Sequence, residues 1–156
     1  MFWMFFALFL AACLAAAATG ALFPPGAWYR ALTKPRWTPP DLAFPVVWSL
    51  LYLGIAIAGA RLAMTPQPGI ALGLWSVQIA LNTLWTPVFF GARRMRAGLV
   101  VILLLWTTIA VSVPVFSAVD PVAALLFAPY LAWVTVAACL NAALIRLNPQ
   151  AATPNG

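Results

Sequence analysis

The sequence WYRALTKPRWTPP, residues 28–40, interrupts a chain that is otherwise almost wholly apolar. It concentrates basic, aromatic and proline residues between two stretches long enough to cross a bilayer. Prolines fix φ and push the residues before them into extended conformations, so we expect loop 23–41 to be ordered. A polar loop of this kind is costly to place beside a membrane. It either anchors the chain in the headgroup region or closes one end of a helical bundle.

Composition places the chain among membrane proteins. Of its 156 residues, 65% are hydrophobic and 6% are charged, whereas soluble domains carry about 25% charged residues. Apolar runs such as 100–105 are continuous rather than alternating, which excludes a β-barrel. The fold class predicted is an all-α membrane protein, a bundle of five transmembrane helices. A single domain covers residues 1–150 and a short polar tail covers 151–156. The helices are expected at about 2–22, 42–61, 69–90, 97–116 and 121–145.

The distribution of positive charge predicts the orientation. With five spans, seven basic residues fall on one side of the membrane and Arg61 alone on the other. The positive-inside rule then places the C-terminus and the loops 23–41 and 91–96 in the cytoplasm, and the N-terminus away from it. This topology explains the net charge of +6 without nucleic acid as a partner. The seven residues are Arg30, Lys34, Arg36, Arg93, Arg94, Arg96 and Arg146.

The first 22 residues resemble a signal peptide in their apolar run. No Lys or Arg precedes that run, so we interpret it as a membrane helix. Its second half is rich in alanine, which lets another helix or a ligand approach the backbone closely.

The chain lacks the residue types that several kinds of catalysis and metal binding require. The chain has no histidine and no glutamate, and Asp41 and Asp120 both fall in expected loops. Zinc sites, paired-carboxylate catalysis and a histidine-ligated haem are therefore excluded. Cys13 and Cys139 are isolated, so neither a disulfide nor a metal site is indicated. Proton-coupled drug export usually relies on a carboxylate inside the membrane, and the expected spans lack one.

The third expected helix carries the most informative pattern. Trp75, Gln78, Asn82 and Trp85 share one face. Amides at membrane depth are costly unless paired, so Gln78 and Asn82 should point into the bundle. They either bond neighbouring helices or contact a mostly apolar ligand. On another part of the helix the pairs Gly69/Gly73 and Ser76/Ala80 suit a homodimer contact, although such a motif is weak alone.

Prolines set the expected helix ends. Pro87 should kink the third helix and Pro114 should end or bend the fourth. Asp120 and Pro121 have the N-cap and N1 signature of a helix start. In the fifth helix Trp133, Ala137 and Leu140 share a face, where the small alanine leaves a hollow.

Three motifs resemble those of the translocator protein family, also called the tryptophan-rich sensory protein (TspO) or peripheral-type benzodiazepine receptor family. Residues 28–40 match the family's loop pattern W-Y-x-x-L-x-K-P-x-W-x-P-P. NTLWTPVFFG, residues 82–91, resembles its third helix. PYLAW at 129–133 and LN at 140–141 resemble its fifth helix. The resemblance spans about 120 residues.

The resemblance implies a function and a site. It implies a homodimer with a cavity under the first loop that binds porphyrins such as protoporphyrin IX, sterols, and benzodiazepine- or isoquinoline-type drugs. No cofactor is required; the porphyrin is a ligand. The implied role is tetrapyrrole sensing or transport and stress regulation. The alternative is an enzyme that degrades porphyrin with light and oxygen, in which Trp48 and Trp133 donate electrons. The implied ligand-binding residues are Thr19, Tyr29, Pro39, Trp48, Asn82, Trp85, Trp133, Ala137 and Leu140.

Two departures from the family pattern affect these expectations. The sterol motif of animal members needs a tyrosine between Leu140 and Arg146, and none is present, so cholesterol is a doubtful native ligand. A tryptophan that some members carry at the start of the fourth helix is Ala97 here.

Overall fold

The computed structural model describes residues 1–152, and this part of the chain contains helices and no strand. The expected all-α class is therefore confirmed. The last four residues of the expected tail, 153–156, lie outside the described residues. The elements in chain order are α1 (Phe2–Leu22), α2 (Ala27–Ala31), α3 (Ala43–Ala63), α4 (Gly69–Thr86), the π-helical turn η1 (Pro87–Gly91), α5 (Met95–Val119) and α6 (Pro121–Leu147).

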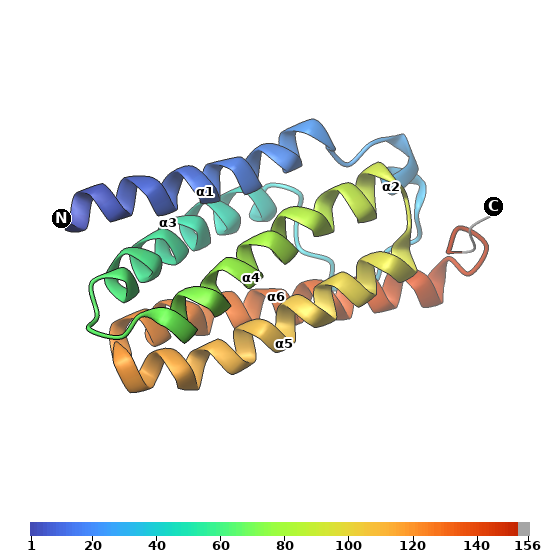
Figure 1. The fold of residues 1–156 in the computed structure, drawn as a ribbon. Coiled ribbons are helices and arrows are strands. Elements are labelled where there is room, and N and C mark those ends of the chain that lie inside the picture. The colour runs from blue at the N-terminus through green and yellow to red at the C-terminus, as the bar shows by residue number, and fades with distance from the viewer. Residues whose placement is uncertain (153–156) are drawn as a thin grey trace.

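The long helices run side by side along the length of the molecule (Figure 1). The short helix α2 lies at one end of this bundle, and the N-terminus lies at the opposite end. A buried core joins α3, α5 and α6 through side chains such as Ile55, Ile109 and Phe127, none of which is accessible to solvent. The outward-facing leucines remain exposed, as expected of a protein whose solvent there is lipid.

Four of the described helices are long and apolar enough to cross a membrane: α1, α3, α5 and α6. Helix α4 is not one of these four. It has 18 residues, and Gln78 and Asn82 on its inner face lower its hydropathy. The structure thus describes a multi-pass membrane protein but leaves α4 without the apolar signature of the other long helices.

Helix ends depart from the sequence-based expectations at the prolines. Pro114 does not end its helix, because α5 continues to Val119. A proline inside a helix removes one backbone hydrogen bond, yet α5 continues for five residues beyond Pro114. At Pro87 the α-helix gives way to the π-helical turn η1, in line with the expected kink. The loop 23–41 contains the helix α2, which the proline pattern did not indicate.

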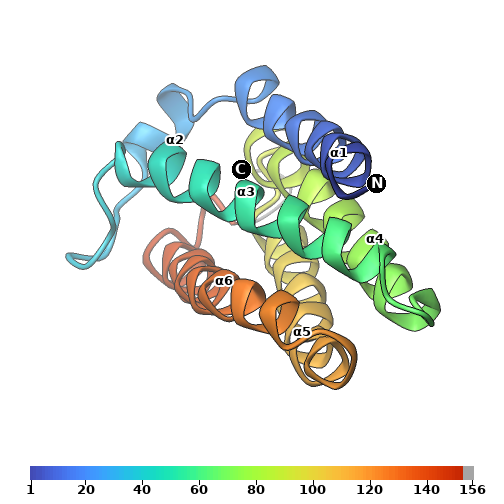
Figure 2. The same ribbon diagram turned by 90° about the vertical axis from the view of Figure 1, so that its left-hand side faces the viewer.

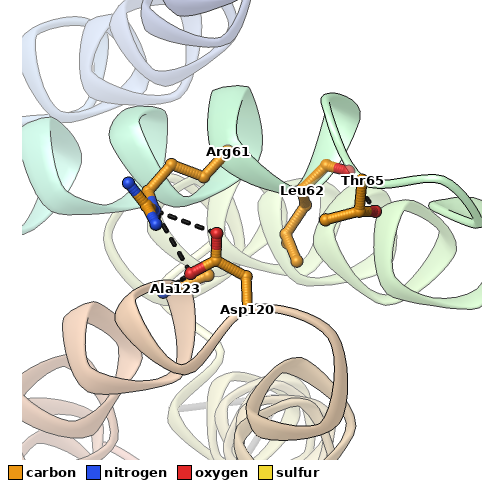
Figure 3. Close-up of polar contacts among 5 residues, drawn as sticks. All are labelled: Arg61, Leu62, Thr65, Asp120 and Ala123. Carbon is orange, nitrogen blue, oxygen red and sulfur yellow. Dashed lines mark hydrogen bonds and ion pairs between the residues drawn. The ribbon is translucent and has the colours of Figure 1, made fainter.

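The end of the bundle opposite α2 is held by an ion pair (Figure 3). Asp120 accepts the backbone N–H of Ala123 at 3.0 Å, which confirms it as the N-cap of α6. Its carboxylate also lies 3.0 Å from Nε of Arg61, near the end of α3. Partial burial acts to raise the pKa of Asp120, but the Ala123 hydrogen bond and the Arg61 guanidinium outweigh it and hold that pKa below its usual value.

Candidate functional site

A cavity of about 640 Å³ lies under α2, between α1, α3, α4 and α6. Its walls include nine aromatic side chains. Trp85 stacks on Phe89, with 5.1 Å between ring centroids, and Trp48 lies 5.4 Å from Tyr52. On the α1 side the wall is built from small residues instead: Ala16, Ala17, Gly20 and Ala21. Flat aromatic surfaces facing small residues leave a slot suited to a flat molecule.

Most of the residues that the sequence suggested for a ligand site line this cavity. They are Tyr29, Trp48, Asn82, Trp85, Trp133, Ala137 and Leu140. Thr19 and Pro39 do not line it. The hydroxyl of Thr19 donates to the carbonyl of Ala16 at 2.6 Å within its own helix. The alanine and glycine side of α1 faces the cavity in its place.

The amide of Asn82 belongs to a network of hydrogen bonds between helices. Its Oδ1 accepts from the Tyr52 hydroxyl at 2.8 Å, and its Nδ2 donates to the Tyr130 hydroxyl at 2.8 Å. Tyr130 in turn donates to Oε1 of Gln78 at 3.0 Å. Both amides point into the bundle, as expected, and link α4 to α3 and α6. Asn82 also lines the cavity, whereas Gln78 is fully buried behind it.

Three buried polar atoms on cavity-lining residues have no hydrogen-bond partner among the described residues. They are the indole Nε1 of Trp85, the indole Nε1 of Trp133 and Oδ1 of Asn141. A buried polar group left without a partner costs about 1–3 kcal/mol. Each of these atoms is itself covered by neighbouring atoms, although the residue that carries it lines the cavity. Asn141 was not among the suggested site residues; its other amide atom, Nδ2, donates to the carbonyl of Met95 at 2.9 Å.

The loop that carries α2 forms the roof of the cavity and is fixed at two points. Tyr29 is 7% exposed and packs edge-on against Phe90, at 5.3 Å between ring centroids. Burial, with a smaller contribution from the charge of Asp41, raises the pKa of Tyr29. The second point is Asn148, which bonds both backbone groups of Thr33. Nothing in the local sequence signals this contact, because 115 residues separate the two.

Charged groups occur at the roof end of the cavity. Arg30, Lys34 and Asp41 line it, so two cations face one carboxylate, while Arg36 is not part of the lining. The Lys34 ammonium lies 4.7 Å from the centre of the Tyr29 ring, a cation–π contact. No group of three or more His, Cys, Asp or Glu side chains that could hold a metal occurs within residues 1–152. The chemistry available is aromatic stacking, hydrogen bonding and cationic attraction.

Comparison with known proteins identifies relatives of the chain. The model of the TspO/MBR family matches residues 5–147. The chain is 49% identical to "Protein CrtK" of Rhodobacter capsulatus over 148 residues, which cover 92% of each protein. It is 46% identical to a "Tryptophan-rich sensory protein" of Cereibacter sphaeroides, covering 95% of this chain and 94% of the relative. It is 37% identical to the human "Translocator protein", covering 78% of this chain and 75% of the relative.

Proposed function

This chain belongs to the TspO/MBR family, and we propose that it binds porphyrins, protoporphyrin IX and haem-type tetrapyrroles among them, in the cavity under α2. Related flat apolar molecules, such as sterols and benzodiazepine- or isoquinoline-type drugs, would compete for the same space. The role proposed is tetrapyrrole sensing or transport in stress regulation. The observation that carries the proposal is a cavity with aromatic side chains on several walls, small residues on the α1 side and cations at one end.

The cavity suits a flat apolar ligand in size and in chemistry. Its volume of about 640 Å³ falls within the range of about 300–1,000 Å³ that is typical of small-molecule sites. Trp48 and Trp133 provide flat apolar walls, and their contact with a ring adds about 0.5–1.5 kcal/mol per aromatic pair beyond area burial.

Arg30 and Lys34 give the ligand a preferred orientation. Porphyrins carry propionate groups on one edge, and a carboxylate is favoured beside a guanidinium or an ammonium group. With the propionates toward these two cations, the apolar edge of the ring would lie among the tryptophans. Asp41 would oppose an anion placed beside it, so the propionates should lie on the Arg30 side.

We propose a membrane arrangement to match. Residues 1–150 form one domain of five spans. Helix α4, the third of them along the chain, counts as a span because η1 extends it by five residues. The N-terminus lies away from the cytoplasm, and the loops 23–41 and 91–96 and the C-terminus lie inside. A homodimer would use the exposed small residues of α4, which leave room for a close helix contact. These are Gly69, Gly73, Ser76 and Ala80.

A second candidate function is light- and oxygen-dependent breakdown of the bound porphyrin. Trp48 lies 5.4 Å from Tyr52 and 6.0 Å from Tyr130, ring centre to ring centre. These rings form an oxidisable cluster that could supply electrons. The relatives are named as sensory or translocator proteins, which favours binding over catalysis. Illumination of the purified protein with protoporphyrin IX decides this point: loss of the Soret absorbance no faster than in detergent alone rules out breakdown.

The binding proposal is tested by titrating tryptophan fluorescence with protoporphyrin IX, haem and cholesterol in parallel. Saturable quenching by the two tetrapyrroles at lower concentration than by cholesterol is expected. Quenching that rises linearly with each ligand and never saturates would mean that the ligands partition into the detergent and have no site.

A further inference from the structure

We propose that the ligand reaches the cavity from the hydrocarbon region of the bilayer, through an opening between the C-terminal half of α1 and the N-terminal half of α3. The inference rests on the proposed function, because it assigns the route to the same cavity. It excludes the more obvious path, from water through the roof formed by α2 and its loop.

The opening is defined by residues that line the cavity and are also exposed. Gly20 and Ala21 are such residues on α1, and Pro45 and Ser49 are such residues on α3. A Cβ added to Gly20 would meet no atom within 4 Å. Figure 2 shows that α1 and α3 move apart toward the end that carries α2. These four residues have small side chains, as a passage for a flat molecule between the two helices would require.

The rims of the opening are apolar. On α1, Leu22 is 73% exposed; on the α3 side, Leu42 is 75% and Val46 is 52% exposed. Exposed aliphatic side chains are favourable in hydrocarbon and unfavourable in water. The opening therefore borders acyl chains, and an apolar ligand dissolved in the bilayer meets it directly.

The other sides of the cavity are closed more firmly. Lifting the roof would break both hydrogen bonds between Thr33 and Asn148. It would also expose the side chain of Tyr29, which is only 7% exposed in the closed structure. Between α3 and α6 the rings of Phe44 and Trp133 are in contact, at 5.6 Å between centroids. Within residues 1–152, by contrast, no side-chain hydrogen bond or aromatic ring pair joins α1 to α3.

The test measures how fast a lipid-dissolved reagent reaches the inside of the cavity. Both native thiols are removed by Cys13→Ala and Cys139→Ala, and a reporter thiol is introduced by Ala137→Cys, since Ala137 lines the cavity. The full chain is reconstituted in liposomes and reacted with pyrene maleimide, which dissolves in the bilayer. The thiol sulfur adds to the maleimide double bond and its proton goes to the neighbouring carbon, so fluorescence reports each reaction.

Two bulky substitutions narrow the opening from opposite rims, Gly20→Trp and Ser49→Trp. Their matched controls are Ala18→Trp and Leu50→Trp, which lie exposed on the same helices and do not line the cavity; Leu50 lies on the side of α3 that faces α6. Each 1.4 kcal/mol of steric cost slows entry about tenfold, so we expect about tenfold or greater slowing for the first pair only. Asn148→Ala, which frees the roof, should leave the rate unchanged.

Three results would overturn the inference. These are an unchanged rate in both rim variants, equal slowing in their controls, and clear acceleration by Asn148→Ala, which would place the route under the roof. Loss of the fold cannot imitate a blocked opening, because an unfolded chain would expose the thiol and react faster. The reaction needs no porphyrin, so failure of the proposed function would appear in the fluorescence titration and leave this result standing.

Discussion

The side chain of Asn148 holds Thr33 by both of its backbone groups. The Thr33 N–H donates to Asn148 Oδ1 at 2.9 Å, and Asn148 Nδ2 donates to the Thr33 carbonyl at 2.9 Å. Because Asn148 directly follows α6, this pair joins the roof of the cavity to the end of the helix that carries Trp133 and Ala137. The roof and the aromatic wall are thus mechanically connected.

Replacement of Asn148 should loosen the roof selectively. Asn148→Ala removes both hydrogen bonds to Thr33, so we expect faster amide exchange in residues 27–41 with little change in α3 and α5. Asn148→Asp is the matched variant, because its carboxylate still accepts from the Thr33 N–H but no longer donates. It should give an intermediate effect in hydrogen–deuterium exchange. Equal protection of the roof in all three proteins would contradict the role assigned to Asn148.

Gly59 is predicted to tolerate no side chain. A Cβ at this position would lie 2.6 Å from Phe9 and 2.9 Å from Nε1 of Trp75. Trp75 is held by its hydrogen bond to the Ile55 carbonyl at 2.9 Å, so it has little freedom to give way. Gly59→Ala should cost about 1–3 kcal/mol of stability.

The control for this prediction is Gly54→Ala in the same helix, where the added Cβ would meet its nearest atom, Cδ2 of Leu126, at an ordinary contact distance of 3.7 Å. It should be neutral or stabilising, by up to about 1 kcal/mol, because alanine favours a helix over glycine. Thermal unfolding in detergent measures both. A Gly59→Ala protein as stable as the parent would show that Phe9 moves aside freely.

The two amides of α4 should differ when they are replaced. Asn82→Leu breaks hydrogen bonds to two tyrosines and leaves their hydroxyls short of partners, at about 1–3 kcal/mol for each unsatisfied group. Gln78→Leu breaks one hydrogen bond and also removes a buried Nε2 that has no partner. We therefore expect Asn82→Leu to lower the unfolding temperature more than Gln78→Leu. The reverse order would contradict the network.

Acid should weaken the end of the bundle opposite the roof. The pKa of Asp120 is lower in the folded protein than its ordinary value of about 3.9. Its contribution to stability is thus fully present above that ordinary value and is lost as the pH falls through the lower, folded value. Unfolding measured from pH 6 downward should show this loss in the parent protein. Asp120→Asn should lack that part of the pH dependence; an identical pH profile in both proteins would contradict the prediction.

Much of the fold could be predicted because local features decide it. Continuous apolar runs, Asp120 with Pro121, and the amides of Gln78 and Asn82 each act within one helix, so their consequences are visible in the sequence. Of the two outcomes expected at Pro114, an end or a bend, the end is wrong, because α5 continues to Val119. The helix α2 was missed because the prolines around it favour extended backbone.

In the candidate site, too, the features that arise within one helix could be predicted, and those that depend on distant segments could not. Tryptophans on a shared helix face indicate an aromatic wall, and the cavity contains them. Thr19 was suggested because it lies in the right part of α1, yet the rotation of that helix turns Gly20 and Ala21 toward the cavity. The hydrogen bonds between Asn148 and Thr33 join two segments 115 residues apart, and no local sequence pattern encodes them.

The central claim, that the cavity under α2 binds a porphyrin, is tested most directly by comparing dissociation constants of protoporphyrin IX. The double variant Trp48→Leu/Trp133→Leu removes two aromatic walls, and Trp3→Leu/Trp37→Leu removes two tryptophans that are 75% and 51% exposed. Loss of two ring contacts of about 0.5–1.5 kcal/mol each predicts roughly 5- to 150-fold weaker binding for the first variant. The second should bind like the parent. Unchanged affinity in the first variant, or equal weakening in both, would contradict the account.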